Sequence, residues 1–286
     1  MSHGGRRINA GWRITPQLEA GRIRKAREDS PTPILSPRAV IMLAIQMFGD
    51  GAAVSWSGGR CSTAALHLAL QVKPDIKVNF NDTGVEFPET YEFIDKMTAE
   101  WDLNLEILKP EPGITFWTLA KKYGFPMIRR SWKTAKNYEQ LYKTGRPMCC
   151  LELKEKPLMK SGIPATITGI RCCESRMRMF TIAQRGQYYH VKTYKRWNFH
   201  PIALWDTPTL LAYHKEHGLP ENKVYAMGQE RCGCWPCTGY IGWMESLNKS
   251  HPRMYKKLKK MMGAPTLWEF IDQGCLDDDG AQEVQE

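Results

Sequence analysis

Short apolar runs alternate with stretches of helical spacing over the first third of the chain. Residues 37–47 carry apolar side chains at helical spacing, and residues 52–56 form an apolar run that predicts a short buried strand. The sequence STAALHLALQV returns to helical spacing after a glycine pair, with Ser62 and Thr63 suited to cap its first turn. We therefore expect the glycine pair between a strand and a helix.

The same alternation continues further along the chain. IKVNFN predicts the next strand, FPETYEFIDKMTAEW the next helix, and LNLEILK a further strand. Strands that alternate with helices are typical of a parallel sheet, so we expect an α/β fold whose twisted sheet carries helices on both faces. Ligands bind beyond the carboxyl ends of such strands, where loops lead into helices. This predicts a ligand site at SGGR and NDTGVEFPET.

The SGGR segment has the properties of an anion-binding loop. Gly58 and Gly59 lack a Cβ, so the backbone after Ser57 can approach an anion closely while the following helix directs free N–H groups at the charge. Arg60 adds a planar fork of donors that suits phosphate or sulfate. The alternative is a tight strand-to-helix turn without a ligand, because one Gly-Gly pair is a weak signal.

Composition places the chain among globular proteins with a basic surface. A hydrophobic fraction of 42% over 286 residues suits one principal domain. No segment has the length of a membrane span and the N-terminus lacks signal-peptide character, which predicts a cytoplasmic protein without a membrane partner. The net charge of +10 suits a nucleotide or nucleic acid. We expect a basic extension (1–35), an α/β domain (36–220), a cysteine-containing segment (221–270) and an acidic tail (271–286).

Four of the nine cysteines stand in two pairs. Cys149 and Cys150 are adjacent, and Cys234 and Cys237 form a CxxC motif. Four thiolates, two from each segment, provide full ligation for a tetrahedral zinc ion or an iron–sulfur cluster. Thioredoxin-like chemistry at CWPC is a third interpretation, but it leaves the adjacent pair without a role. A framework of disulfides fits poorly, because the number of cysteines is odd and the chain is long for a disulfide scaffold.

Several segments resemble one known family in the same order along the chain. SWSGGRCSTAALHL resembles the phosphate loop of the PP-loop ATP pyrophosphatase superfamily, and NFNDTGVEFPETYEFI resembles the second signature of its phosphoadenylyl-sulfate (PAPS) reductase family. The segments CCLELKEKPL, GIRCCESRMR, HPIALWDTPTLLAYHKEHGLPENKVYAMG and RCGCWPCT look like the remaining landmarks of the iron–sulfur branch. The resemblance extends from about Ser55 to Tyr240, far beyond a match to one motif.

The resemblance implies roles for particular residues. A [4Fe–4S] cluster beside the nucleotide site would be held by Cys149, Cys150, Cys234 and Cys237, with zinc as the structural alternative. Lys154 matches a lysine that links the charge of the cluster to that of the substrate, and its alternative role is a surface lysine. The adenine nucleotide, either ATP or (phospho)adenylyl sulfate, is expected at Ser57, Gly58, Gly59, Arg60, Ser62, Asp82, Thr83, Gly84, Arg171, Glu174, Ser175 and Arg178.

The arginine signature GIRCCESRMR has two interpretations. Its guanidinium groups at Arg171 and Arg178 offer planar bidentate donors, which suit a phosphate or sulfate. Glu174 and Arg178 also have the i, i+4 spacing of an ordinary ion pair on a helix. We favour the anion site.

The sequence departs from the family pattern in the phosphate loop and at the C-terminus. The loop has Arg60 where the family has lysine and Cys61 where it has aspartate, so a Mg²⁺ ion that accompanies ATP is expected to bind differently here. The Glu-Cys-Gly-Leu-His tail, whose cysteine attacks sulfate sulfur in sulfonucleotide reductases, is absent. Cys275 is the candidate nucleophile near the C-terminus, and its acidic neighbours at 277–279 raise a thiol pKa.

Three functions follow from the resemblance. In the leading interpretation the loop binds ATP, a DNA backbone or tRNA acceptor is activated with release of pyrophosphate, and sulfur from a cysteine desulfurase displaces AMP. In the alternative, (phospho)adenylyl sulfate is reduced to sulfite with thioredoxin. A non-catalytic subunit that senses nucleotide or cluster is the third. The residues expected to carry catalysis are Arg60, Lys154, Arg171 and Cys275.

Overall fold

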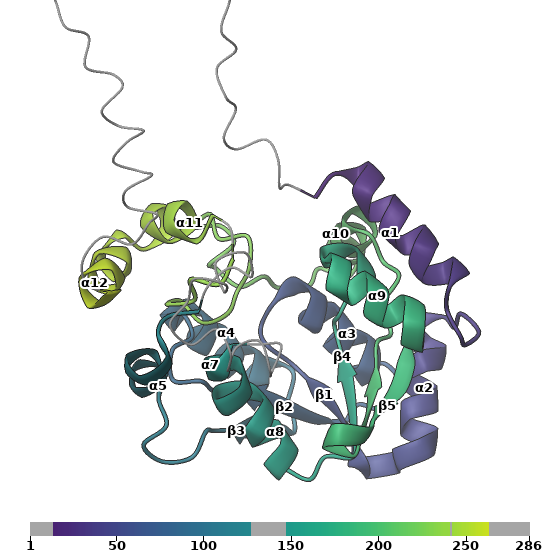
Figure 1. Cartoon of the computed structure of the whole chain (residues 1–286). Helices are drawn as coiled ribbons and strands as arrows, with labels where there is room; N and C mark the ends of the chain where they lie inside the picture. The colour runs from purple at the N-terminus through teal and green to yellow at the C-terminus, as the bar shows by residue number, and fades with distance from the viewer. Residues whose placement is uncertain (1–13, 127–146, 241, 263–286) are drawn as a thin grey trace, which may run out of the picture.

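A six-stranded sheet forms the centre of the molecule (Figure 1). The computed structural model describes residues 14–126, 147–240 and 242–262. The strands lie in the order β3-β2-β1-β4-β6-β5, and each neighbouring pair is parallel except β5 with β6. Their bounds are β1 (Ala52–Ser55), β2 (Lys77–Asn81), β3 (Leu105–Leu108), β4 (Ala165–Thr168), β5 (Tyr188–Val191) and β6 (Arg196–Phe199). This mostly parallel sheet confirms the predicted α/β class.

The middle of the sheet is fully buried. Val54 of β1 pairs with Val78 of β2 on one side and with Ile167 of β4 on the other, and none of the three side chains is exposed. Strands of a parallel sheet that are covered on both faces consist of near-continuous apolar runs. The apolar run at 52–54 fits this rule for β1, while β2, also found where it was predicted, alternates Val78 and Phe80 with polar residues.

Strand β5 differs from the others because it runs antiparallel to β6 at the edge of the sheet. The two strands are joined by a single turn, η5 (Lys192–Tyr194), followed by Lys195 with a φ of 49°. A connection this short permits a hairpin, whereas a parallel neighbour needs a crossover of a dozen or more residues.

Helices connect the strands and cover the sheet. The helices are α1 (Pro16–Glu28), α2 (Pro37–Phe48), α3 (Arg60–Leu70), α4 (Pro88–Glu100), α5 (Phe116–Tyr123), α7 (Met148–Cys150), α8 (Lys156–Lys160), α9 (Arg176–Arg185), α10 (Thr207–Glu216), α11 (Trp243–Ser250) and α12 (Pro252–Met262), with short turns η1 (Gly49–Gly51), η3 (Leu151–Glu155) and η4 (Cys172–Glu174). The main core joins the sheet to α2, α3 and α4 through side chains such as Ile41, Leu66 and Met97, which are completely buried. The helices predicted at 37–47 and 87–101 are confirmed as α2 and α4.

Helix α3 begins at Arg60, two residues before Ser62, where the helical spacing of the sequence starts. Gly59 is its N-cap residue and Arg60 its first residue. Ser62 stabilises the turn from inside the helix, because its Oγ accepts a hydrogen bond from the Gly59 N–H at 3.2 Å. Thr63 is engaged elsewhere, since its Oγ1 accepts from Trp56 Nε1 at 3.1 Å. The phosphate loop is thus shorter than the sequence suggested.

Helix α1 packs on the arginine-rich part of the molecule and lies beside α9 in Figure 1. Ala26 is buried in a cluster with Cys172 of η4 and Ile182 of α9. Glu19, only 6% exposed, accepts hydrogen bonds from the backbone N–H and the hydroxyl of Thr207 at 3.0 and 2.5 Å. A buried carboxylate with two donors fixes α1 against the start of α10.

The boundaries predicted from sequence between the segments 1–35, 36–220, 221–270 and 271–286 stay predictions.

The C-terminal part, residues 219–240 and 242–262, packs beside α4 and α5. Phe87 and Trp243 belong to one buried cluster, which Trp117 and Trp235 extend. A β-bridge between Glu86 and Cys234 ties the cysteine segment to the loop after β2.

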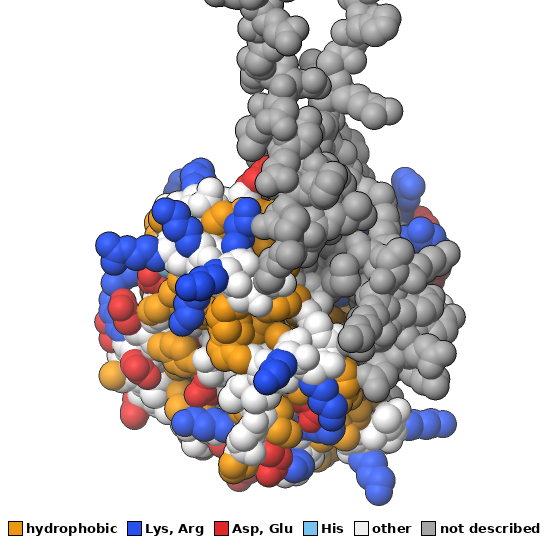
Figure 2. All heavy atoms as spheres, turned by 60° about the vertical axis from the view of Figure 1, so that its left-hand side comes forward, with side chains coloured by type: hydrophobic (Ala, Val, Ile, Leu, Met, Phe, Trp, Pro, Cys, Tyr) orange, Lys and Arg blue, Asp and Glu red, His pale blue; other side chains and the backbone are white. Residues whose placement is uncertain are grey.

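The surface reflects the basic composition. Figure 2 shows Lys and Arg side chains standing out between apolar and acidic ones on the face that includes the left-hand side of Figure 1. Arg253, Lys256, Lys257 and Lys260 of α12 are exposed. Of the helices in the described ranges, none combines the length and apolar character needed to cross a membrane.

Candidate active site

The loop between β1 and α3 forms the floor of the candidate site. The N–H groups of Ser57 and Gly59 both donate to Ser62 Oγ at 3.2 Å. Gly58 has a φ of +70°, a conformation that glycine adopts without strain. At Gly59 a Cβ would lie 2.8 Å from Cys232 Sγ, so the cysteine segment closes one side of the loop. The absence of a side chain at Gly59 therefore allows Cys232 to approach the backbone of the loop closely.

Gly169, at the end of β4, supports the same loop from another side. A Cβ at this position would lie 2.4 Å from the carbonyl carbon and oxygen of Cys61 and 2.6 Å from the nitrogen of Ser62. These are backbone atoms of the first turn of α3, which cannot move aside as a side chain can. The end of β4 thus fixes where this turn lies.

Arg60 is held by a carboxylate and an aromatic ring. Its Nε and Nη2 donate to the two carboxylate oxygens of Glu221 at 2.7 and 2.8 Å, and its guanidinium carbon lies 4.1 Å from the centre of the Tyr225 ring. These hydrogen bonds raise the pKa of Arg60 and lower that of Glu221. The guanidinium that we expect to donate hydrogen bonds to phosphate is therefore oriented by residues near the start of the cysteine segment.

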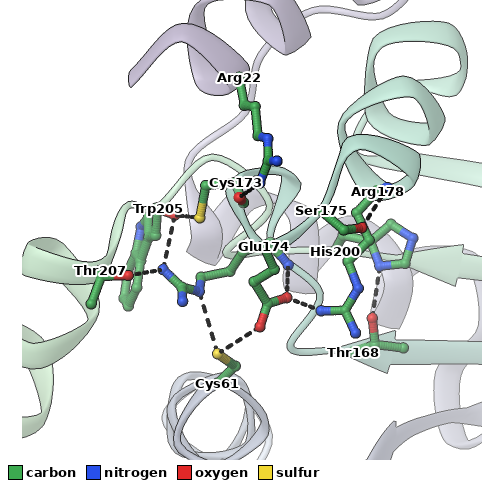
Figure 3. A network of polar contacts seen from close by, with 11 residues as sticks. Arg22, Cys61, Thr168, Cys173, Glu174, Ser175, Arg178, His200, Trp205 and Thr207 are labelled. Carbon is green, nitrogen blue, oxygen red and sulfur yellow. Dashed lines mark hydrogen bonds and ion pairs between the residues drawn. The ribbon is translucent and has the colours of Figure 1, made fainter. Parts of the chain in front are cut away.

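The arginine signature forms a network with the thiol of Cys61 (Figure 3). Arg171 Nε donates to Cys61 Sγ at 3.3 Å, and this thiol in turn donates to Glu174 Oε1 at 3.6 Å. Burial opposes the positive charge of Arg171, but the neighbouring thiols outweigh it and raise its pKa. A guanidinium and a carboxylate thus flank one thiol.

Glu174 also holds Arg178. The two side chains form an ion pair, and the backbone N–H of Arg171 donates to Glu174 Oε2 at 3.2 Å. Ser175 caps α9, because its Oγ accepts from the Arg178 N–H at 3.1 Å. The i, i+4 pair that the sequence offered as an alternative is present, and it stands on the wall of the candidate site.

These elements surround one cavity of about 800 Å³. Eight residues predicted for the nucleotide line it, namely Ser57, Gly59, Arg60, Ser62, Arg171, Glu174, Ser175 and Arg178. Arg231 and Tyr225 add a guanidinium and a phenol from the cysteine segment. The walls come from β1, α3, η4, α9 and the cysteine segment, which places the cavity beyond the carboxyl ends of β1 and β4.

The second predicted signature lies toward the cysteines. Asp82 Oδ1 accepts hydrogen bonds from the Gly84 N–H at 2.9 Å and the Tyr91 hydroxyl at 2.7 Å. Thr83 Oγ1 lies 3.5 Å from Cys234 Sγ. The residues of this loop that the sequence assigned to the nucleotide therefore contact each other and the CxxC motif.

The two cysteine pairs share one neighbourhood. A hydrogen bond with Cys150 and burial raise the pKa of Cys149, and charge on Cys237 and Cys234 adds to this effect. Burial raises the pKa of Cys234 to about 11, despite the nearby Lys154. Within residues 14–126, 147–240 and 242–262, however, no three His, Cys, Asp or Glu side chains are grouped as they would be around a metal ion.

Lys154 stands between the cysteines and an acidic side chain. Its Nζ lies 3.6 Å from Glu86 Oε1, and Cys234 Sγ lies 3.6 Å from the same oxygen. Burial disfavours the ammonium, but Cys234, Glu86 and Cys150 together raise the pKa of Lys154. The lysine thus stays charged beside the thiols, and its link between cluster and substrate stays a prediction.

Some residues of the site were not anticipated from sequence. Glu221 and Tyr225 lie in a segment that resembles a family landmark, but no role was predicted for them, and their contact with Arg60 depends on the fold. Arg231 and Cys232 belong to the landmark RCGCWPCT, which is the signal that points to them. Cys275, the predicted nucleophile, lies outside the described residues.

Comparisons with known proteins agree with this architecture. Residues 51–240 match the phosphoadenosine phosphosulfate reductase domain. An adenosine 5′-phosphosulfate reductase of Bacillus mycoides is 30% identical over 242 residues, which cover 83% of this chain and 92% of that protein. A namesake from Salinibacter ruber is 29% identical over 206 residues, covering 71% of this chain and 73% of the relative.

The solved structure of PAPS reductase from Candida auris, a phosphate complex, superposes with a TM-score of 0.53 at 20% identity. The match covers 79% of this chain and 98% of that one, and at this identity it shows a shared fold. The domain match includes both cysteine pairs, the phosphate loop and the arginine signature. The chain therefore belongs to the phosphoadenosine phosphosulfate reductase family of enzymes.

Proposed function

We propose that this protein reduces a sulfonucleotide, adenylyl sulfate or its 3′-phosphate, to sulfite. The observation that carries the proposal is the convergence of Arg60, Arg171, Arg178 and Arg231 with the phosphate loop on one cavity. A cavity lined by several guanidinium groups suits a ligand with more than one anionic group. The names of the relatives support a sulfonucleotide as that ligand.

The residues divide the task of binding. The N-terminal turn of α3, whose dipole favours an anion, faces the phosphate of the nucleotide, and Glu221 orients Arg60 beside it. Arg171, which contacts Cys61 of the same turn, and Arg178 also line the cavity, where their charge suits the sulfate. Preorganised guanidinium groups of this kind favour charge that develops on departing oxygens.

Reduction is better supported than the ATP-dependent sulfur transfer that the sequence first favoured. The loop has the thiol of Cys61 where the family has an aspartate, and a hard Mg²⁺ ion prefers oxygen ligands to sulfur. A sulfonucleotide already carries an activated sulfate. Its reduction releases no pyrophosphate and so does not need a Mg²⁺ ion for that step.

The four paired cysteines fit an iron–sulfur cluster. Cys149, Cys150, Cys234 and Cys237 supply the four thiolates, and Lys154 supplies a charge that offsets those of cluster and substrate. When bound, such a cluster would place negative charge beside the substrate anion, which the ammonium of Lys154 would offset.

The proposed reaction needs one reactant besides the sulfonucleotide, a protein dithiol that supplies two electrons. The thiolate of Cys275 attacks the sulfur of the sulfonyl group, the S–O bond to the phosphate breaks, and the nucleoside phosphate leaves with that oxygen. The dithiol then attacks the S-sulfocysteine, releases sulfite, regenerates Cys275 and closes to a disulfide. The nucleotide sulfate has gained two electrons and the dithiol has lost them.

The test is sulfite formation by anaerobically purified full-length protein with adenylyl sulfate, its 3′-phosphate, or ATP, and thioredoxin as the dithiol. We expect sulfite from a sulfonucleotide and none after the substitution Cys275→Ser. The protein should be brown and contain iron, whereas colourless protein with stoichiometric zinc would reject the cluster. Pyrophosphate from ATP, with a nucleic acid acceptor and a sulfur donor but no sulfite from either sulfonucleotide, would overturn the proposal in favour of sulfur transfer.

A further inference from the structure

Cys61 occupies an unusual place for a thiol. It belongs to the first turn of α3, where the helix dipole favours a negative charge, and its side chain is half-buried on the wall of the 800 Å³ cavity. Cys172 and Cys173, the neighbouring thiols in the arginine signature, are completely buried. Cys61 is therefore the one of these three that a dissolved molecule can reach.

Two charged groups contact the thiol (Figure 3). Glu174 Oε1 accepts from Cys61 Sγ at 3.6 Å, so a carboxylate is in place to receive the thiol proton. Arg171 Nε donates to the same sulfur at 3.3 Å, so a guanidinium is in place to stabilise the thiolate. A nucleophile, a base and a cation are thus assembled from two elements of the chain.

The cation in this arrangement is fixed. Arg171 is only 6% exposed, and its Nη1 donates to the carbonyl oxygen of Trp205 at 3.4 Å and to Thr207 Oγ1 at 3.3 Å. Thr207 is itself bound to Glu19 of α1. Because these contacts anchor the guanidinium from behind, its contact with Cys61 does not depend on a ligand.

The positive charge of Arg171 also acts on the buried thiols nearby, but burial outweighs it. Burial raises the pKa of Cys172 to about 11 and that of Cys173 to about 12. Both therefore stay protonated near neutral pH, and a protonated thiol is a poor nucleophile. Reactivity in this part of the protein should concentrate at Cys61.

We propose that Cys61 is a modification site that takes up a small anionic disulfide. Its thiolate attacks one sulfur of the disulfide, a mixed disulfide forms on Cys61, and the other half leaves as a thiolate that receives the proton from Glu174. The arginines of the cavity, Arg60, Arg178 and Arg231, attract the negative charge of the reagent. The adduct fills the cavity, so modified protein cannot bind the nucleotide.

This inference goes beyond the proposed reduction and depends on it only for the ligand that competes with modification. If the cavity holds the nucleotide, bound AMP shields Cys61; if it does not, Cys61 still reacts. Nucleotide use would then respond to the balance of thiol and disulfide around the protein, independently of Cys275.

The experiment treats anaerobically purified full-length Cys275→Ser protein with oxidised glutathione at pH 7.5 and follows each cysteine by peptide mass spectrometry. We expect a mixed disulfide on Cys61 well before Cys172 and Cys173. The neutral reagent hydroxyethyl disulfide should lose most of this preference. Glu174→Gln, which keeps the size of the side chain, should slow the reaction at Cys61 by about tenfold or more.

Calorimetric titration with AMP on the same preparation separates the two proposals. Binding of AMP that does not slow the modification of Cys61, or modification of Cys172 and Cys173 at the same rate as Cys61, would overturn the inference. A rate unchanged in Glu174→Gln with intact circular dichroism would also overturn it. Absence of AMP binding together with rapid modification of Cys61 would instead count against the proposed function alone.

Discussion

The substitution Gly169→Ala tests how the end of β4 fixes the phosphate loop. The new Cβ would lie 2.4 Å from two backbone atoms of Cys61 and 2.6 Å from Ser62 N, whereas non-bonded heavy atoms normally approach to about 3.5–4.0 Å. The first turn of α3 must therefore move by about 1 Å. Overpacking of this kind costs about 1–3 kcal/mol, and a shift of about 1 Å in a binding group can reduce activity by about 100-fold.

The assays are thermal unfolding and calorimetric titration with AMP. A loss of 1 kcal/mol lowers the melting temperature by about 2–4 °C in a protein of this size. Gly21→Ala is the matched control, because a Cβ there meets nothing within 4 Å and the residue lies inside α1, where alanine is favoured by about 0.5–1 kcal/mol. Gly169→Ala with unchanged melting temperature and AMP affinity would refute the reasoning, since the loop would then yield without cost.

Three further predictions follow from individual contacts. Arg60→Ala should weaken AMP binding by roughly tenfold to a hundredfold, because a charge-assisted contact with the phosphate is lost. Glu221→Gln keeps the guanidinium and should keep much of the affinity. Equal losses of affinity in calorimetry would contradict the role of Arg60 as a phosphate ligand. Burial lowers the pKa of His200 to about 3, so on acidification the imidazole takes up a proton in the unfolded chain before it does so in the folded protein. The free energy of unfolding should therefore fall by about 1 kcal/mol per pH unit below about pH 6.5. Urea unfolding of His200→Gln should show a smaller slope. Thr207→Val removes a donor to buried Glu19 and should cost about 1–3 kcal/mol in the same assay, whereas an unchanged midpoint would mean that α1 contributes little.

The sequence was sufficient for those parts of the molecule that depend on local pattern. Strand β1 is apolar up to Ser55, and β2 alternates apolar Val78 and Phe80 with polar residues. Helices α2 and α4 show helical spacing, so the positions of all four elements could be predicted closely. The start of α3 could not, because Ser62 accepts hydrogen bonds from Gly59 and Ser57, a contact that arises only when the loop folds back on the helix.

The candidate site was predictable where it rests on motifs and hidden where it rests on tertiary contacts. The phosphate loop and the arginine signature line one cavity, as expected from their resemblance to a known family. The pairing of Arg60 with Glu221 joins residues far apart in sequence, and no spacing rule points to it. Likewise, nothing in the sequence indicated that Arg171 turns its Nε toward Cys61.

The position of α1 bears on where the catalytic unit begins. The family domain match starts at residue 51, yet α1 supplies Glu19 to Thr207 and covers Cys172. A fragment trimmed to the matched boundary would strip the backing from Arg171 and open the apolar interior of η4 and α9 to water. The smallest autonomous form of this protein therefore has to include residues that domain comparison leaves out.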